Sequence, residues 1–90
     1  MFDVRYHGLR IVVSHAAMRE LIKEEKTLGD VVKILEEGYE APRKRKKGTI
    51  EKWMDKENKT VNVVVAKDFN ETLKEECWVL IHVGKFTWRK

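Results

Sequence analysis

The sequence predicts an α+β domain in which two short helices pack on one face of an antiparallel β-sheet, as two layers. Apolar residues recur at the helical spacing of three and four residues between positions 14 and 38. Beyond position 42, segments rich in valine and tryptophan are separated by short polar turns, as in a sheet of consecutive strands. Because 42% of its 90 residues are apolar, the chain can form one hydrophobic core, and residues 1–90 are predicted to be a single domain.

The first segment, residues 2–13, is predicted to be a strand. His7–Gly8 interrupts it, either as a β-bulge or as a tight turn that would divide it into two strands. Leu9, Ile11 and Val13 share one side of this segment because side chains alternate along a strand, and we assign that side to the core.

A helix is predicted to begin after Ser14, a favourable N-cap residue, and to end near Lys26. The apolar residues on its buried face have helical spacing and are Ala17, Met18, Leu21 and Ile22. His15 and Arg19 are four residues apart, so we expect them to lie together on a flank of this helix.

A second helix is predicted to follow at once, with Thr27 as N-cap and Asp30 completing a capping box. Its apolar stripe consists of Leu28, Val31, Val32 and Leu35. Gly38 is expected to end the helix in the left-handed conformation that glycine adopts readily. Since almost no linker separates the two helices, we expect them to form a helical hairpin on the sheet.

Three further strands are expected at approximately 43–54, 60–67 and 77–83, with a polar loop at 68–76. Short connections favour an antiparallel meander, so the predicted order is β-α-α-β-β-β.

The last of these strands is apolar on both faces. We assign its more uniformly apolar face to the helices; that face carries Cys77, Val79, Ile81 and Val83. The sheet face away from the helices is then expected to carry Trp53, Trp78 and His82 beside the basic strand.

Residues 43–54 contain six cations and one anion, and five of the cations are consecutive. Such a run cannot be buried without partners, so we expect a strand whose cations face water or an anion. The predicted nucleic-acid contacts are Arg43, Lys44, Arg45, Lys46, Lys47 and Trp53. Bases could stack on Trp53, Trp78 and Trp88 wherever these are exposed. The alternative is that the charges only protect an edge strand from aggregation.

RNA cleavage would need a general base, a general acid and cations that stabilise developing negative charge. The candidate catalytic residues are therefore His15, Arg19 and His82. The structural alternatives are a His15 that bonds nearby backbone and a His82 that is a half-buried strand residue. The sequence predicts no metal and no cofactor, because its histidines are widely spaced and it has no glycine-rich phosphate loop.

Cys77 is the only cysteine and stands in an apolar segment, so we expect it to be buried as a small apolar residue. The sequence shows neither a signal-peptide pattern nor an apolar segment of about 18 residues, which predicts a cytoplasmic protein without a membrane partner. The many Lys and Glu residues and the absence of Gln are typical of thermophile proteins.

Short motifs along nearly the whole chain resemble the RelE/ParE/BrnT-like toxin superfamily of small prokaryotic domains. An uncharacterised family within or near it begins its first helix with His-Ala and an arginine four residues after the histidine, as in Ser14–Arg19. Its second helix has the form Asp-Val-x-x-x-Leu-x-x-Gly, as in Asp30–Gly38. A basic strand and a valine-rich strand follow, as in Arg43–Trp53 and Val61–Val65. The chain departs from the family at Glu24–Thr27, where an Arg-Gly dipeptide is common.

The resemblance implies a RelE-like fold and, by superfamily tendency, RNA cleavage on the ribosome, gyrase poisoning or binding of a protein partner. We therefore expect a toxin-like domain that binds RNA or another polyanion through its basic strand, with ribonuclease activity left open. The expected partners are RNA or the ribosome, an antitoxin-like protein and a second copy of the chain. The alternative is a non-enzymatic protein–protein interaction module that forms homodimers.

Overall fold

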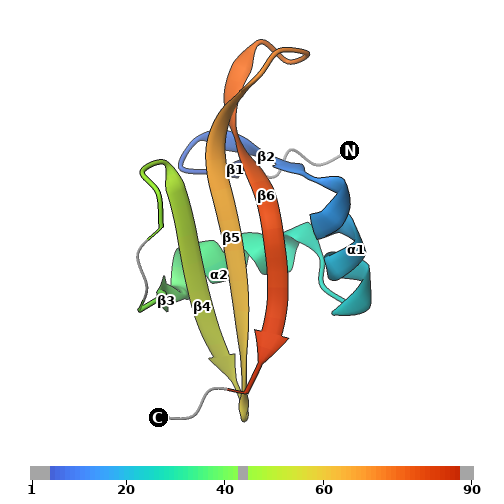
Figure 1. Cartoon of the computed structure of the whole chain (residues 1–90), viewed down its shortest axis with the longest axis vertical. Coiled ribbons are helices and arrows are strands. Elements are labelled where there is room, and N and C mark those ends of the chain that lie inside the picture. The colour runs from blue at the N-terminus through green and yellow to red at the C-terminus, as the bar shows by residue number, and fades with distance from the viewer. Residues whose placement is uncertain (1–4, 43–44, 88–90) are drawn as a thin grey trace.

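The computed structural model describes residues 5–42 and 45–87, which fold into two helices and one curled sheet of six strands (Figure 1). The α+β class is confirmed. The elements in chain order are β1 (Arg5–Tyr6), β2 (Leu9–Val13), α1 (His15–Lys23), α2 (Leu28–Glu37), β3 (Tyr39–Glu40), β4 (Thr49–Lys56), β5 (Lys59–Asn70) and β6 (Glu75–Phe86).

The strands lie in the order β1-β2-β6-β5-β4-β3. The expected antiparallel meander of the last three strands is confirmed, but β2 pairs with β6 in parallel, so the sheet is mixed. The sheet also contains two short strands that the predicted order omitted. One of them, β1, arises because His7 and Gly8 have φ values of 51° and 78° and form the tight turn that was one of the two expectations.

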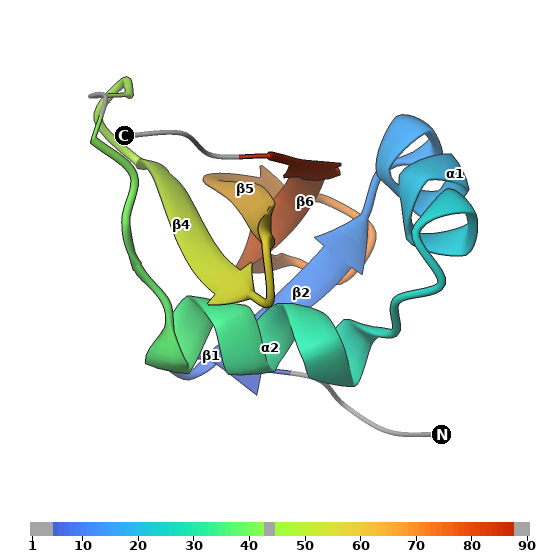
Figure 2. The same ribbon diagram turned by 90° about the horizontal axis from the view of Figure 1, so that it is seen from below.

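The two helices cover different parts of the molecule. Figure 2 shows α2 crossing the open side of the curled sheet, where it contacts β1, β4 and β5, whereas α1 packs beside β6. The expected helical hairpin is therefore wrong. The reason is the turn after Lys23: Glu25 has a positive φ of 54°, and the chain changes direction before α2 begins.

Both predicted helix starts are confirmed. The Ser14 hydroxyl accepts a hydrogen bond of 3.1 Å from the Ala17 backbone N–H. Thr27 Oγ1 accepts from the Asp30 N–H at 3.2 Å, and Asp30 Oδ2 accepts from the Thr27 N–H at 2.9 Å, which completes the capping box.

Gly38 does not have the expected left-handed conformation. Its φ and ψ are −74° and 174°, which any residue can adopt. Glycine is required by space instead, because a Cβ atom here would lie 2.5 Å from the Ile34 carbonyl oxygen and 2.6 Å from that of Trp53. Gly38 thus lets the end of α2 lie directly against the backbone of β4.

The core lies between the inner side of the sheet and the two helices. Its buried members come from β1, β2, both helices, β5 and β6 and are Tyr6, Ile11, Ala17, Leu21, Val31, Ile34, Leu35, Val61, Val63, Val65, Trp78, Leu80 and Val83. Of the stripe expected on α1, Met18 and Ile22 are exposed instead, so the buried face of this helix is narrow.

The face assignment in β6 is wrong for Trp78 and Leu80, which belong to the helix-side core, and for Cys77 and Val79, which alternate with them and lie on the outer face. The cause is a β-bulge: Leu80 pairs with Val65 and His82 pairs with Val64, so Ile81 is an extra residue. The bulge moves His82 to the outer side of the sheet, as expected, and returns Val83 to the inner side.

The basic segment precedes its strand instead of forming it. Strand β4 begins at Thr49, and Lys46–Thr49 form a turn in which Gly48 has a φ of 86°. Arg43 and Lys44 lie outside the described residues. At the other end of the sheet, β5 and β6 extend beyond the expected limits into a long ribbon that protrudes from the body (Figure 1).

Cys77 is buried, as expected, and burial raises the pKa of its thiol, with a further contribution from Asp68. Neither helix in the described part of the chain is long and apolar enough to cross a membrane.

Candidate nucleic-acid interface

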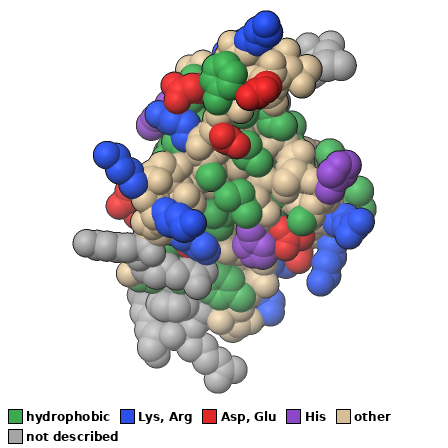
Figure 3. Space-filling model, turned by 45° about the horizontal axis from the view of Figure 1, so that its top comes forward, with side chains coloured by type: hydrophobic (Ala, Val, Ile, Leu, Met, Phe, Trp, Pro, Cys, Tyr) green, Lys and Arg blue, Asp and Glu red, His purple; other side chains and the backbone are tan. Residues whose placement is uncertain are grey.

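The outer face of the sheet, opposite the core, carries a row of polar side chains across β4, β5 and β6. We call Arg45, Glu51, Asn62, His82 and Glu20 the polar row. It begins in the basic segment, crosses three neighbouring strands and ends on α1. The space-filling view shows acidic, basic and histidine side chains around an apolar patch on this side of the molecule (Figure 3).

Glu51 is the buried centre of the polar row, since only 1% of its side chain is exposed. One carboxylate oxygen accepts from Arg45 Nε at 2.9 Å. The other accepts from Trp53 Nε1 at 2.8 Å and from Asn62 Nδ2 at 3.2 Å. A buried carboxylate is costly unless such partners replace its hydration, so this cluster holds Arg45 and Asn62 in fixed positions.

His82 and Glu20 form a hydrogen-bonded pair at the other end of the row. His82 Nδ1 lies 2.8 Å from one Glu20 carboxylate oxygen, and the second oxygen accepts from the Val83 backbone N–H at 3.1 Å. Because a carboxylate only accepts, Nδ1 carries the proton of this bond, and Nε2 is the nitrogen left for proton transfer. The His82 side chain is 43% exposed, so a ligand can reach it.

Gly84 allows the two halves of the row to approach each other. A Cβ atom at this position would lie 2.7 Å from Asn62 Oδ1 and 2.8 Å from His82 Nε2. The Asn62 amide and the His82 imidazole therefore border the same space, directly above the Gly84 backbone. Sequence analysis did not indicate this role, because Gly84 follows the segment in which the strand was expected.

A shallow cavity of about 370 Å³ lies over this end of the row. Lys23 of α1 and Lys85 of β6 line it together with His82 and Asn62. Lys85 lies 3.8 Å from a Glu24 carboxylate oxygen. Glu20 and Glu24 line the cavity as well, so it places an oriented imidazole beside two ammonium groups and two carboxylates.

The structure does not bring the three predicted catalytic residues together. His15 and Arg19 are exposed on α1, and within residues 5–42 and 45–87 no interaction joins either of them to His82. The partner of His82 is Glu20, one position after Arg19. Sequence analysis missed Glu20 because the helix packing that directs it toward β6 is a tertiary feature.

The predicted nucleic-acid contacts have different surroundings. Lys46 and Lys47 are exposed, whereas Arg45 is partly neutralised by Glu51. Trp53 is only 4% exposed, and its ring meets Phe86 edge-on with centroids 4.9 Å apart. Trp78 is buried and donates from Nε1 to the Tyr6 carbonyl at 3.0 Å, so neither tryptophan offers an open face for a base. Trp88 lies outside the described residues.

Glu51 and Asn62 are the other functional candidates that sequence analysis missed. Glu51 lies two residues before the buried Trp53, so both side chains share one side of β4. This alternation could have indicated that the Glu51 carboxylate is buried and therefore hydrogen-bonded. Asn62 is a polar residue between two valines of a valine-rich strand, which is a comparable indication.

In the described part of the chain, no group of three His, Cys, Asp or Glu side chains has the arrangement of a metal site. Comparisons of this chain with protein-family models, with curated proteins and with solved structures found no match.

Proposed function

We propose that this protein is a toxin-like, RelE-like domain that binds RNA through the outer face of its sheet, in the cytoplasm. The single observation that carries the proposal is the polar row, which connects the basic segment to the His82–Glu20 pair on one face. Lys46 and Lys47 supply exposed charge at one end, and Lys23 and Lys85 supply it beside His82 at the other. A polyanion that follows the row meets cations at both ends.

The His82–Glu20 pair adds a ribonuclease option to this proposal. His82 Nε2 would take the proton of an RNA 2′-hydroxyl while the 2′-oxygen forms a bond to phosphorus. The bond from phosphorus to the 5′-oxygen breaks, and that oxygen takes a proton from water. Glu20 is then a positioning residue that holds the imidazole, and Lys23 and Lys85 stabilise the charge on phosphorus. His15 and Arg19 are candidate contacts for the flanking nucleotides on the exposed side of α1.

A protein-binding function is the second candidate. Several large apolar side chains are exposed, among them Met18 and Ile22, one turn apart on α1, and Ile81 at the bulge of β6. Exposed apolar side chains that lie close together are typical of surfaces that bind another protein. Under this candidate the partner is an antitoxin-like protein or a second copy of the chain.

The test measures RNA affinity as a function of salt with a fluorescent single-stranded RNA. The double variant Lys46→Gln/Lys47→Gln should reduce the slope of log affinity against log salt by about 1.5 units, since each phosphate contact contributes about 0.7–0.9. The matched control, Lys67→Gln/Lys74→Gln, removes the same charge from the protruding ribbon and should leave the slope unchanged. Equal slopes in all three proteins would refute binding through the basic segment.

The same RNA, incubated alone and with ribosomes, tests the ribonuclease option. His82→Ala should abolish cleavage, and Glu20→Gln should lower it and shift its pH profile while RNA affinity is kept. If the wild-type protein binds RNA but does not cut it under either condition, the binding proposal stands and the catalytic option is rejected.

A further inference from the structure

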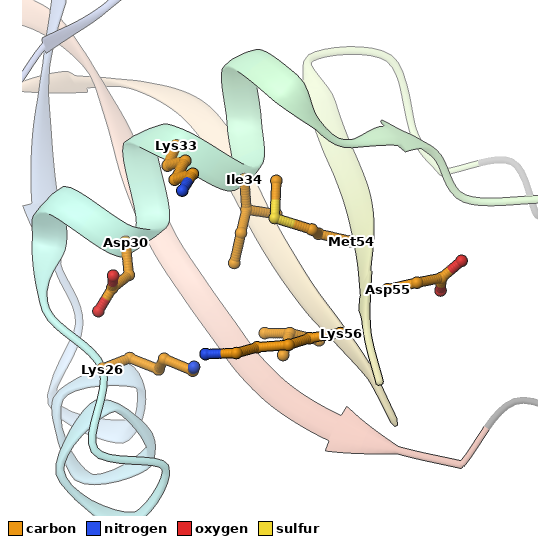
Figure 4. Close-up of a pocket in the computed structure, with 8 residues that line it drawn as sticks. Lys26, Asp30, Lys33, Ile34, Met54, Asp55 and Lys56 are labelled. Carbon is orange, nitrogen blue, oxygen red and sulfur yellow. The ribbon is translucent and has the colours of Figure 1, made fainter. Parts of the chain in front are cut away.

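A second cavity, of about 280 Å³, lies on the helix side of the sheet between α2 and the end of β4 (Figure 4). Three lysines border it: Lys26 before α2, Lys33 on α2 and Lys56 at the end of β4. The sheet separates it from the polar row, so this cavity is independent of the outer face and of the RNA-binding proposal.

The ammonium groups of this cavity have no local counter-charge in contact with them. Figure 4 shows the side chains of Lys26 and Lys56 pointing toward each other across the opening. Among the described residues, the ammonium groups of these two and of Lys33 have no hydrogen bond and no ion pair within 4 Å. Two cations that point at one another repel unless an anion lies between them, so the arrangement favours an anionic ligand.

The two carboxylates nearest the cavity are committed to other groups. Asp55 points away from it (Figure 4), and its Oδ1 accepts from the hydroxyls of Tyr39 at 2.9 Å and of Thr60 at 2.8 Å. Asp30 uses Oδ2 in the capping box with Thr27. Lys26 and Lys56 act on Asp30 only as nearby charges, and the three lysines outnumber it.

The remaining wall of the cavity is apolar. Ile34 and Val61 are buried core residues, and Met54 packs against the same core. The volume of about 280 Å³ lies just below the range of about 300–1,000 Å³ that is usual for small-molecule sites, so a ligand of this cavity would be small.

We propose that this cavity binds a small organic phosphate. A phosphate monoester carries a charge of about −1.5 to −2 at neutral pH and presents three acceptor oxygens, which suits three ammonium groups better than a carboxylate does. Its phosphate lies between Lys26 and Lys56, and a short apolar body lies against Ile34 and Met54.

The test uses phenyl phosphate as the probe and NMR of methyl-labelled methionine as the readout. Met54 lines the cavity, whereas Met18 is exposed on α1 and serves as an internal control. Phenyl phosphate should shift the Met54 methyl signal in a saturable way and leave that of Met18 in place. Inorganic phosphate should shift it at higher concentration only, because it makes no contact with the apolar wall.

Two double variants distinguish binding at this cavity from non-specific electrostatic attraction of phosphate to the protein surface. Lys26→Gln/Lys56→Gln should weaken the binding of phenyl phosphate about tenfold, the combined effect of losing two exposed charge contacts. Lys67→Gln/Lys74→Gln removes the same charge elsewhere and should bind as the wild type does. Equal weakening in both variants, or equal affinity for inorganic and phenyl phosphate, would overturn the proposal, whatever the outcome of the RNA experiments.

Discussion

At the scale of single residues, Gly38 is a glycine that is required by lack of space and not by its backbone conformation. The backbone at Gly38 is extended and unstrained, yet any side chain would meet the carbonyl oxygens of Ile34 and Trp53. The glycine therefore sets the distance between α2 and β4, and with it the width of the cavity that both elements line.

We expect Gly38→Ala to lower the free energy of unfolding by about 1–3 kcal/mol, because the methyl group would force α2 away from β4. Urea denaturation measures this loss. The matched control is Gly29→Ala in the first turn of α2, where the nearest atom to a Cβ would be Thr27 Oγ1 at 3.5 Å. Alanine should stabilise the protein there by about 0.5–1 kcal/mol. A neutral Gly38→Ala would contradict the close-approach argument.

At the scale of elements, the Asp30 carboxyl at the N-terminus of α2 makes the stability of the fold depend on pH. The backbone hydrogen bond from Thr27 lowers the pKa of Asp30, and the charges of Lys26 and Lys56 lower it further. A carboxyl whose pKa is lower in the folded state stabilises the fold above its unfolded value, near 3.8, and this contribution is lost as the pH falls through the folded value.

We expect Asp30→Asn to be less stable than the wild type at pH 6 by about 0.5 kcal/mol, a small value because the carboxyl is largely exposed. The difference should disappear as the pH is lowered from about 5 to below 3, since both proteins then lack the charge. Thermal unfolding across this range measures it. Glu71→Gln, in the turn of the β5–β6 ribbon, is the control, and a difference that persists at low pH would argue against this linkage.

At the scale of elements, the β-bulge at Ile81 could not be predicted from the sequence. Strict alternation assigns Trp78, Leu80 and His82 to one face, and the extra residue separates them onto two. Helix caps were predictable because a cap is a local bond between residues three apart. A bulge depends on the partner strand, and so do the contacts of Glu20, Glu51 and Asn62, which explains why most of the polar row was missed.

At the scale of the whole molecule, Trp78 joins segments that are distant in the chain. Its indole donates to the Tyr6 carbonyl, and its ring packs near that of Tyr6 with centroids 5.9 Å apart. The sequence analysis assigned Trp78 to the sheet face away from the helices, where a base could stack on it, but the structure places it in the core. Composition and periodicity gave the α+β class and the meander, whereas the parallel pairing of β2 with β6 has no local signal.

We expect Trp78→Phe to destabilise the protein by about 1–3 kcal/mol, since the Tyr6 carbonyl loses a buried donor and the core loses volume. Urea denaturation measures this change, and sedimentation should show an unchanged molecular mass. Phe69→Leu, at an exposed site of the ribbon, should change stability by no more than about 0.5 kcal/mol. If Trp78→Phe changed the molecular mass but not the stability, Trp78 would lie in an interface between copies of the chain and not in the core.

The parallel contact between β2 and β6 also determines the order in which the chain can fold. The β4–β5–β6 meander involves near neighbours and can form early, but β2, which pairs locally with β1, gains its second partner only after β6 has formed. During synthesis, the N-terminal half of the chain leaves the ribosome before β6. The apolar sides of the β1–β2 hairpin and of both helices are therefore exposed until β6 has formed. We therefore expect the N-terminal segment to close onto β6 late in folding.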